Sequence, residues 1–253
     1  MSAAPALDGV WLDEIRAAHE GRHPREIIRW GLETFARERR VVLTSLQAEG
    51  VAIADMAIEI DRDVRIITID TGRLPEETLT YLDTLRRRWD RGIEVAMPDP
   101  EELQPFVAAN GVNPFYASVD MRLRCCELRK VRPLQRALAD VDCWFAGLRR
   151  EHSAERSEVE LVEIDEEHGG ILKVNPLAGW STEDVRDYLR RHRLPQHPLY
   201  AAGYTSIGCA PCTRPVRPGE DERAGRWWWE QDVAKECGIH GRVIPVLVSE
   251  GAA

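Results

Sequence analysis

Lysine is scarce in this chain of 253 residues, and several common sequence features are missing altogether. Lysine occurs only at Lys130, Lys173 and Lys235, and every other basic residue apart from histidine is arginine. No apolar run is long enough to span a bilayer. The first residues have neither the basic segment nor the apolar core of a signal peptide. We therefore expect a cytoplasmic protein with no membrane association.

Charge and composition exclude further classes of protein. The net charge of -9 and the pI near 5.4 argue against a general binder of nucleic acid or anionic membranes. An anionic substrate would therefore need a local basic site. The hydrophobic fraction of 43% is enough for a core without disulfides. Six cysteines in a cytosolic chain then indicate metal binding or catalysis.

Four of the cysteines form two close pairs, Cys125 with Cys126 and Cys209 with Cys212. Thiolate sulfur favours zinc or iron–sulfur clusters over hard cations, and a C-x-x-C turn brings two sulfurs to one site. Adjacent side chains on a helix point about 100° apart, so the Cys125–Cys126 pair suits a cluster better than one small ion. The spacing favours a metal site over a disulfide, a redox pair or inert thiols, and it leaves zinc and iron–sulfur both open.

The two remaining cysteines have different surroundings. Cys143 lies in an apolar run and is expected to be buried and inert. Cys237 stands near Lys235 and His240, and such neighbours lower the pKa of a thiol and raise its thiolate fraction. The alternative is an incidental cysteine close to the end of the chain.

Three segments in this order resemble one family over residues 41–240. The Cys125–Cys126 pair, the segment Cys-Ala-Pro-Cys-Thr from Cys209 and the segment Glu-Cys-Gly-Ile-His around Cys237 are similar to those of the assimilatory adenylyl-sulfate (APS) reductases. That family is related to the 3′-phosphoadenylyl-sulfate (PAPS) reductases but has the additional cysteines. The resemblance implies a [4Fe-4S] cluster held by Cys125, Cys126, Cys209 and Cys212.

Apolar runs and periodic segments alternate along the chain. Strands are expected at residues 41–44, 65–69, 93–97, 143–146, 159–164 and 171–174. Helices are expected within 11–40 and at 51–60, 75–89, 101–110, 121–130 and 181–192. This alternation predicts an α/β fold with a doubly wound, mostly parallel sheet, and the resemblance implies the adenine nucleotide alpha-hydrolase-like type.

We expect a single reductase domain over residues 1–253. Residues 1–40 would form N-terminal helices, residues 41–222 the nucleotide- and cluster-binding core, and residues 223–253 a flexible catalytic tail.

Three loops after strands are expected to meet at one edge of the sheet, where doubly wound folds bind ligands. They cover residues 45–50, 70–73 and 147–150. The first has no Gly-Lys-Ser/Thr and is therefore not a Walker loop. It also lacks the Ser-Gly-Gly of ATP pyrophosphatases, and it differs from the related reductases, which have an aspartate where Gly50 stands. Ser45 and the amides at the following helix start can still hold an anion.

The resemblance extends to substrate and catalytic residues. Arginine binds phosphate and sulfate through two parallel hydrogen bonds, although a single arginine is more often a solvated surface charge. The implied substrate-binding residues are Ser45, Gln47, Glu49, Thr71, Gly72, Arg73, Gly147, Arg149, Arg156, Arg223 and Arg226. The implied catalytic residues are Cys237, His240 and Lys130.

The implied reaction is reduction of APS to sulfite and AMP in sulfate assimilation. Cys237 would carry the transferred sulfur group, and reduced thioredoxin would be the electron donor. The near alternative is a PAPS reductase. A tRNA-modifying sulfurtransferase or ATP pyrophosphatase is disfavoured by the missing loop and the acidic charge, and a non-catalytic zinc module is the third possibility.

Overall fold

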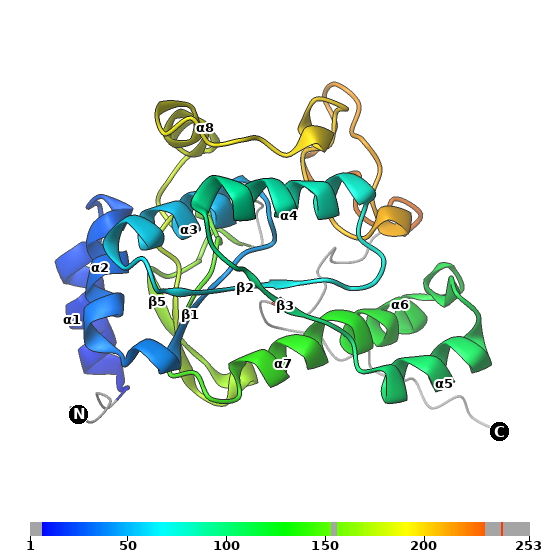
Figure 1. Cartoon of the computed structure of the whole chain (residues 1–253), viewed down its shortest axis with the longest axis horizontal. Helices are drawn as coiled ribbons and strands as arrows, with labels where there is room; N and C mark the ends of the chain where they lie inside the picture. The colour runs from blue at the N-terminus through cyan, green and yellow to red at the C-terminus, as the bar shows by residue number, and fades with distance from the viewer. Residues whose placement is uncertain (1–6, 153–155, 231–238, 240–253) are drawn as a thin grey trace.

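The computed structural model describes residues 7–152, 156–230 and 239. Its centre is a six-stranded sheet in the order β3-β2-β1-β4-β6-β5 (Figure 1). The strands are β1 Arg40–Leu43, β2 Arg65–Ile69, β3 Glu94–Ala96, β4 Cys143–Phe145, β5 Val162–Asp165 and β6 Ile171–Val174. All neighbouring strands pair in parallel except β5, which runs antiparallel to β6. The predicted doubly wound, mostly parallel sheet is confirmed.

Helices cover both faces of this sheet. They are α1 Gly9–His19, α2 Pro24–Thr34, α3 Ala48–Ile60, α4 Glu76–Trp89, α5 Pro100–Asn110, α6 Val119–Cys126, α7 Arg132–Leu138 and α8 Thr182–Arg191. In Figure 1, α3, α4 and α8 lie on one side of the sheet, whereas α6 and α7 lie on the other. The central strands are therefore buried on both faces, which explains the unbroken apolar runs in β1 and β4.

Two details of the helices bear on the sequence predictions. The expected helical stretch near the N-terminus is two helices, because Gly21 between them has a φ of +73°. At the start of α8, Ser181 and Asp184 form a capping box: the amide of Asp184 donates to Ser181 Oγ at 3.1 Å, and the amide of Ser181 donates to Asp184 Oδ2 at 2.9 Å. Within the described residues, none of the helices has the length and apolar character of a membrane span.

Candidate functional site

A cavity of about 910 Å³ lies at the carboxyl edge of the sheet. The loops after β1, β2 and β4 form its floor, as the sequence predicts, and α8 with residues of the 196–226 segment forms the other walls. The predicted site residues that line it are Ser45, Gln47, Glu49, Thr71, Lys130, Gly147, Arg149, Arg156, Cys209, Arg223 and Arg226. Gly72 and Arg73 do not line it, and their proposed contact with substrate stays a prediction. Cys237 and His240 lie outside the described residues.

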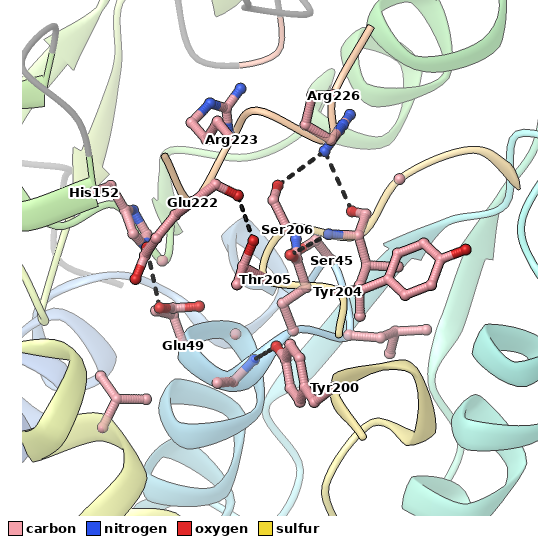
Figure 2. Close-up of a pocket in the computed structure, with 18 of the residues that line it drawn as sticks. Ser45, Glu49, His152, Tyr200, Tyr204, Thr205, Ser206, Glu222, Arg223 and Arg226 are labelled. Carbon is pink, nitrogen blue, oxygen red and sulfur yellow. Dashed lines mark hydrogen bonds and ion pairs between the residues drawn. The ribbon is translucent and has the colours of Figure 1, made fainter. Parts of the chain in front are cut away.

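The loop after β1 is held by hydrogen bonds, and one of the backbone N–H groups at the start of α3 already has an acceptor. Leu46 is buried with a φ of +59°, and its amide donates to Thr44 Oγ1 at 3.0 Å. At the start of α3, the amide of Ala48 donates to the hydroxyl of Tyr200 at 3.0 Å (Figure 2). One amide that could hold an anion therefore already has a partner.

Glu49 is fixed as an anion at one end of the cavity. Its carboxylate accepts from Arg149 Nε at 3.0 Å and lies 2.9 Å from His152 Nε2 (Figure 2). Burial alone would raise the pKa of Glu49, but the hydrogen bond from His152 and the charge of Arg149 outweigh burial and lower it to about 2. The carboxylate of Glu49 is therefore ionised and would repel a phosphate or sulfate placed directly against it.

The guanidinium of Arg149 is hydrogen-bonded to other groups of the protein. Only 1% of the residue is exposed, and its guanidinium also donates to Glu151, to the carbonyl of Trp180 and to Thr182 Oγ1. These partners leave little capacity for a bound anion, so the geometry assigns Arg149 mainly to holding Glu49 in place.

His152 is a cavity residue that the sequence analysis missed. Its Nδ1 lies 3.2 Å from Nη1 of Arg156. A guanidinium can only donate, so Nδ1 accepts and the proton lies on Nε2, which donates to Glu49. Its position in the arginine-rich loop after β4 is the signal that could have identified it.

The opposite end of the cavity carries cationic residues. Lys130, Arg223 and Arg226 line it, and Figure 2 shows Arg223 and Arg226 on the same segment. Arg226 Nη1 donates to Ser206 Oγ at 3.2 Å and to the carbonyl of Ile207 at 3.4 Å. A Cβ at position 208 would stand 2.5 Å from the Arg226 guanidinium, so Gly208 is needed for this close approach.

The four paired cysteines meet next to that cationic end. Each is less than a tenth exposed and none forms a disulfide. They pack with Phe115 and Trp227, a tryptophan whose buried Nε1 has no hydrogen-bond partner. Burial and the neighbouring Cys209 raise the pKa of Cys212 to about 12. Four buried thiols with an unpartnered donor beside them fit a bound metal centre, since metal binding would displace their protons.

A π-helical turn brings the adjacent cysteines to this site. It covers Glu127–Val131 and joins α6 to α7 directly after Cys126. Such turns inside helices occur frequently at functional sites. The turn also buries Lys130, which lies at both the large cavity and the cysteine site, as does Cys209. The two sites therefore share a wall.

Further cations surround the cysteines. Arg129 donates to the carbonyl of Thr71 at 2.7 Å, and Arg122 forms a buried ion pair with Glu230 at 2.7 Å. Arg122 and Arg226 lie over the ring of Trp227 at 4.5 and 4.7 Å. Trp227 is fully buried and packs in the same cluster as the four cysteines.

The fold and this site define a doubly wound α/β protein with a ligand cavity at the carboxyl edge of its sheet and four clustered cysteines beside that cavity. Residues 39–215 match the family model of the phosphoadenosine phosphosulfate reductase domain. The chain belongs to this family.

Curated relatives and solved structures agree with this assignment. An adenosine 5′-phosphosulfate reductase of Burkholderia cepacia is 47% identical over 83% of this chain and 85% of its own length. The enzyme of that name from Allochromatium vinosum is 46% identical over 80% of this chain and 78% of its own. A phosphoadenylyl-sulfate reductase from Candida auris superimposes with a TM-score of 0.71 at 25% identity, covering 85% of this chain and all of that one. A yeast FAD synthetase, 13% identical with a TM-score of 0.52 over 80% of this chain and 73% of its own, shares the fold.

Proposed function

We propose that this protein reduces APS to sulfite and AMP, with reduced thioredoxin or a similar dithiol protein as donor, in cytoplasmic sulfate assimilation toward cysteine. The observation that carries the proposal is the shared wall. One cavity is lined by several cationic side chains, and Lys130 and Cys209 line both this cavity and the cysteine site. The names of the curated relatives favour APS as the substrate.

The charged residues of the cavity favour one orientation of the bound substrate. The phosphosulfate of APS carries the negative charge, so we assign it to the end lined by Lys130, Arg223 and Arg226. The adenosine would extend toward Glu49 and His152, where an uncharged group avoids repulsion by a carboxylate.

Cys237 is the proposed nucleophile. It lies outside the described residues, but Ile239, two positions later, lines the cavity. The Cys237 thiolate would attack the sulfate sulfur, and the bond from that sulfur to the phosphate oxygen would break with its electron pair leaving on AMP. Lys130, the two arginines and His240 would neutralise the charge on the transferring group.

A dithiol then completes the reaction. One thiolate of the donor attacks the sulfur of Cys237, so sulfite leaves with the electron pair of the broken sulfur–sulfur bond. The second donor thiol resolves the mixed disulfide and restores the Cys237 thiol. The two electrons that convert sulfate-level sulfur to sulfite come from oxidation of the donor dithiol to a disulfide.

A [4Fe-4S] cluster is the proposed occupant of Cys125, Cys126, Cys209 and Cys212. Around a zinc ion with four thiolates, the sulfurs would be roughly 3.8 Å apart, given zinc–sulfur bonds of about 2.3 Å. Among the described residues, no three cysteine sulfurs lie within 4.8 Å of one another, which supports a larger centre. When bound, the cluster would join the helix that carries Cys125 and Cys126 to the segment that carries Cys209 and Cys212, and it would place a fixed charge beside the cavity.

One assay tests the proposal directly. Sulfite release is measured from APS and, separately, from PAPS, each with reduced thioredoxin, while iron and zinc are quantified in the same preparation. We expect APS to be preferred by at least about tenfold in kcat/KM, which corresponds to about 1.4 kcal/mol. Equal use of PAPS would contradict the substrate assignment, and a colourless preparation with stoichiometric zinc would contradict the cluster.

A further inference from the structure

The segment Ser206–Cys209, here called the Cys209 loop, is held from two directions (Figure 2). On one side, the backbone amide of Ile207 donates to Oε1 of Gln47 at 2.8 Å. On the other side, the carbonyl of Ile207 and the hydroxyl of Ser206 accept from Arg226. One peptide segment of this loop is therefore fixed by the loop after β1 and by a cationic residue of the cavity.

The far end of the Cys209 loop is fixed at the cysteine site. The sulfur of Cys209 lies 3.2 Å from Thr71 Oγ1, and the amide of Ala210 donates to the carbonyl of Arg73 at 2.8 Å. Ile207 is only two residues before Cys209. A short segment with hydrogen bonds at both ends therefore connects Cys209 to the contact with Gln47.

Gln47 uses both ends of its side-chain amide to make this connection. Its Nε2 donates to Ser45 Oγ at 3.2 Å, which orients a hydroxyl that lines the cavity. Gln47 occupies the N-cap position of α3, yet its side chain makes no capping hydrogen bond. Ser, Thr, Asp and Asn are preferred at such positions because they cap the helix. The side chain of Gln47 is therefore engaged in joining two loops rather than in stabilising the helix.

We propose that Gln47 is a positioning residue that couples nucleotide binding to retention of metal at the four cysteines. The inference rests on the proposed function only in that the cavity takes an adenine nucleotide and the cysteines hold a metal centre. Nucleotide bound against Ser45 fixes Gln47, Gln47 fixes Ile207, and Ile207 fixes Cys209. Coupling between two sites is reciprocal for binding free energies, so bound nucleotide must raise metal affinity by the same factor by which bound metal raises nucleotide affinity. We expect the tighter metal binding to appear as slower metal loss.

Metal release tests this coupling without any measurement of activity. The metal-loaded protein is mixed with the chromogenic chelator 4-(2-pyridylazo)resorcinol, which detects both iron and zinc, with and without saturating AMP. We expect AMP to slow release at least about fivefold in the wild-type protein. In Gln47→Met, which keeps the side-chain length but has neither hydrogen-bonding atom, we expect AMP to change the rate by less than about twofold.

A second glutamine provides the matched control. Gln135 lies in α7 with an exposed side chain and does not line the cavity. Gln135→Met is expected to retain the full effect of AMP. If Gln47→Met fails to hold metal, Gln47→Asn serves instead, because its shorter side chain cannot span both contacts.

The outcomes are distinct. AMP protection in the wild-type protein and in the control, but not in the Gln47 variant, supports the coupling. Equal protection in all three proteins, or no protection in the wild-type protein, overturns it. Failure to form sulfite from APS would refute the proposed function and would leave this result unaffected.

Discussion

The side chains around Glu49 in the cavity form one connected set. Arg149 is buried beneath Glu49 and holds its carboxylate, while His152 contacts the same carboxylate from the loop after β4. Removing one member of a buried ion pair leaves the other without compensation, which costs more stability than the pair itself provides. The stability of this end of the cavity should therefore depend on Glu49.

Glu49→Gln is expected to lower the free energy of unfolding at pH 7 by on the order of 2–3 kcal/mol. The pKa of Glu49 is lowered to about 2 from its ordinary value of 4.5. Its carboxylate therefore contributes stability above pH 4.5, and this contribution is lost as the pH falls toward 2. Urea unfolding at several pH values measures the free energy of unfolding of both proteins. The difference in this free energy between variant and wild type should become smaller below pH 4.5.

Glu151→Gln is the control for this prediction. Glu151 contacts the same guanidinium, but its side chain is 56% exposed. We expect a loss of no more than about 1 kcal/mol. The assigned role of the buried carboxylate would be wrong if both variants lost the same stability. It would also be wrong if the stability lost in Glu49→Gln did not change with pH.

Sequence reasoning found individual residues of this site but not their partners. Glu49 and Arg149 were both predicted to contact substrate, whereas the structure shows them bonded to each other. Gln47 meets Ile207, which lies 160 positions later in the chain. Hydrogen bonds between distant loops depend on the final packing of the fold, and no local pattern reports them. His152 was missed for the same reason, since its role depends on which side chains face it.

The helices and strands were predicted from the sequence more accurately than the contacts of the site. The central strands were predictable because both of their faces are buried, so their apolar residues form unbroken runs. The hairpin of β5 and β6 was predictable from two short runs around Gly169 and Gly170. The π-helical turn after Cys126 was not predicted. Its extra residue per turn is stabilised by the packing of the cysteine site and leaves no recognisable spacing in the sequence.

Helix α3 approaches the end of β1 closely at Gly50, and this approach predicts the effect of a substitution there. A Cβ at position 50 would stand 2.5 Å from Thr44 Oγ1 and 3.1 Å from Thr44 Cα. Gly50→Ala should therefore displace the loop after β1, lower stability by about 1–3 kcal/mol and weaken AMP binding. Urea unfolding and calorimetric titration with AMP measure the two effects.

Gly9→Ala is the matched change in another helix. No atom lies within 4 Å of a Cβ at position 9, so alanine should be neutral or should add up to about 1 kcal/mol through its higher helix propensity. Unchanged AMP affinity in Gly50→Ala would show that the loop tolerates the displacement and does not depend on this close approach.

For the molecule as a whole, the metal centre should join α6, the π-helical turn and the Cys209 loop into one cooperative unit. Cys126→Ala is expected to lose bound metal and to lower the melting temperature by at least about 5 °C, because metal binding contributes to folding. Cys143→Ala, at a fully buried cysteine in β4, should keep its metal. Metal analysis with thermal unfolding of both variants decides the point, and metal loss in Cys143→Ala would contradict the assignment of ligands.

The central claim is that Cys237 carries the transferred sulfur group, and mass spectrometry tests it most directly. Wild-type protein incubated with APS and no thiol donor should release AMP and gain the mass of one SO3 group on the peptide that contains Cys237. Cys237→Ser should form neither adduct nor sulfite, while keeping its metal content and its binding of AMP. An adduct on Cys143, or sulfite formation by Cys237→Ser in the presence of thioredoxin, would contradict the account.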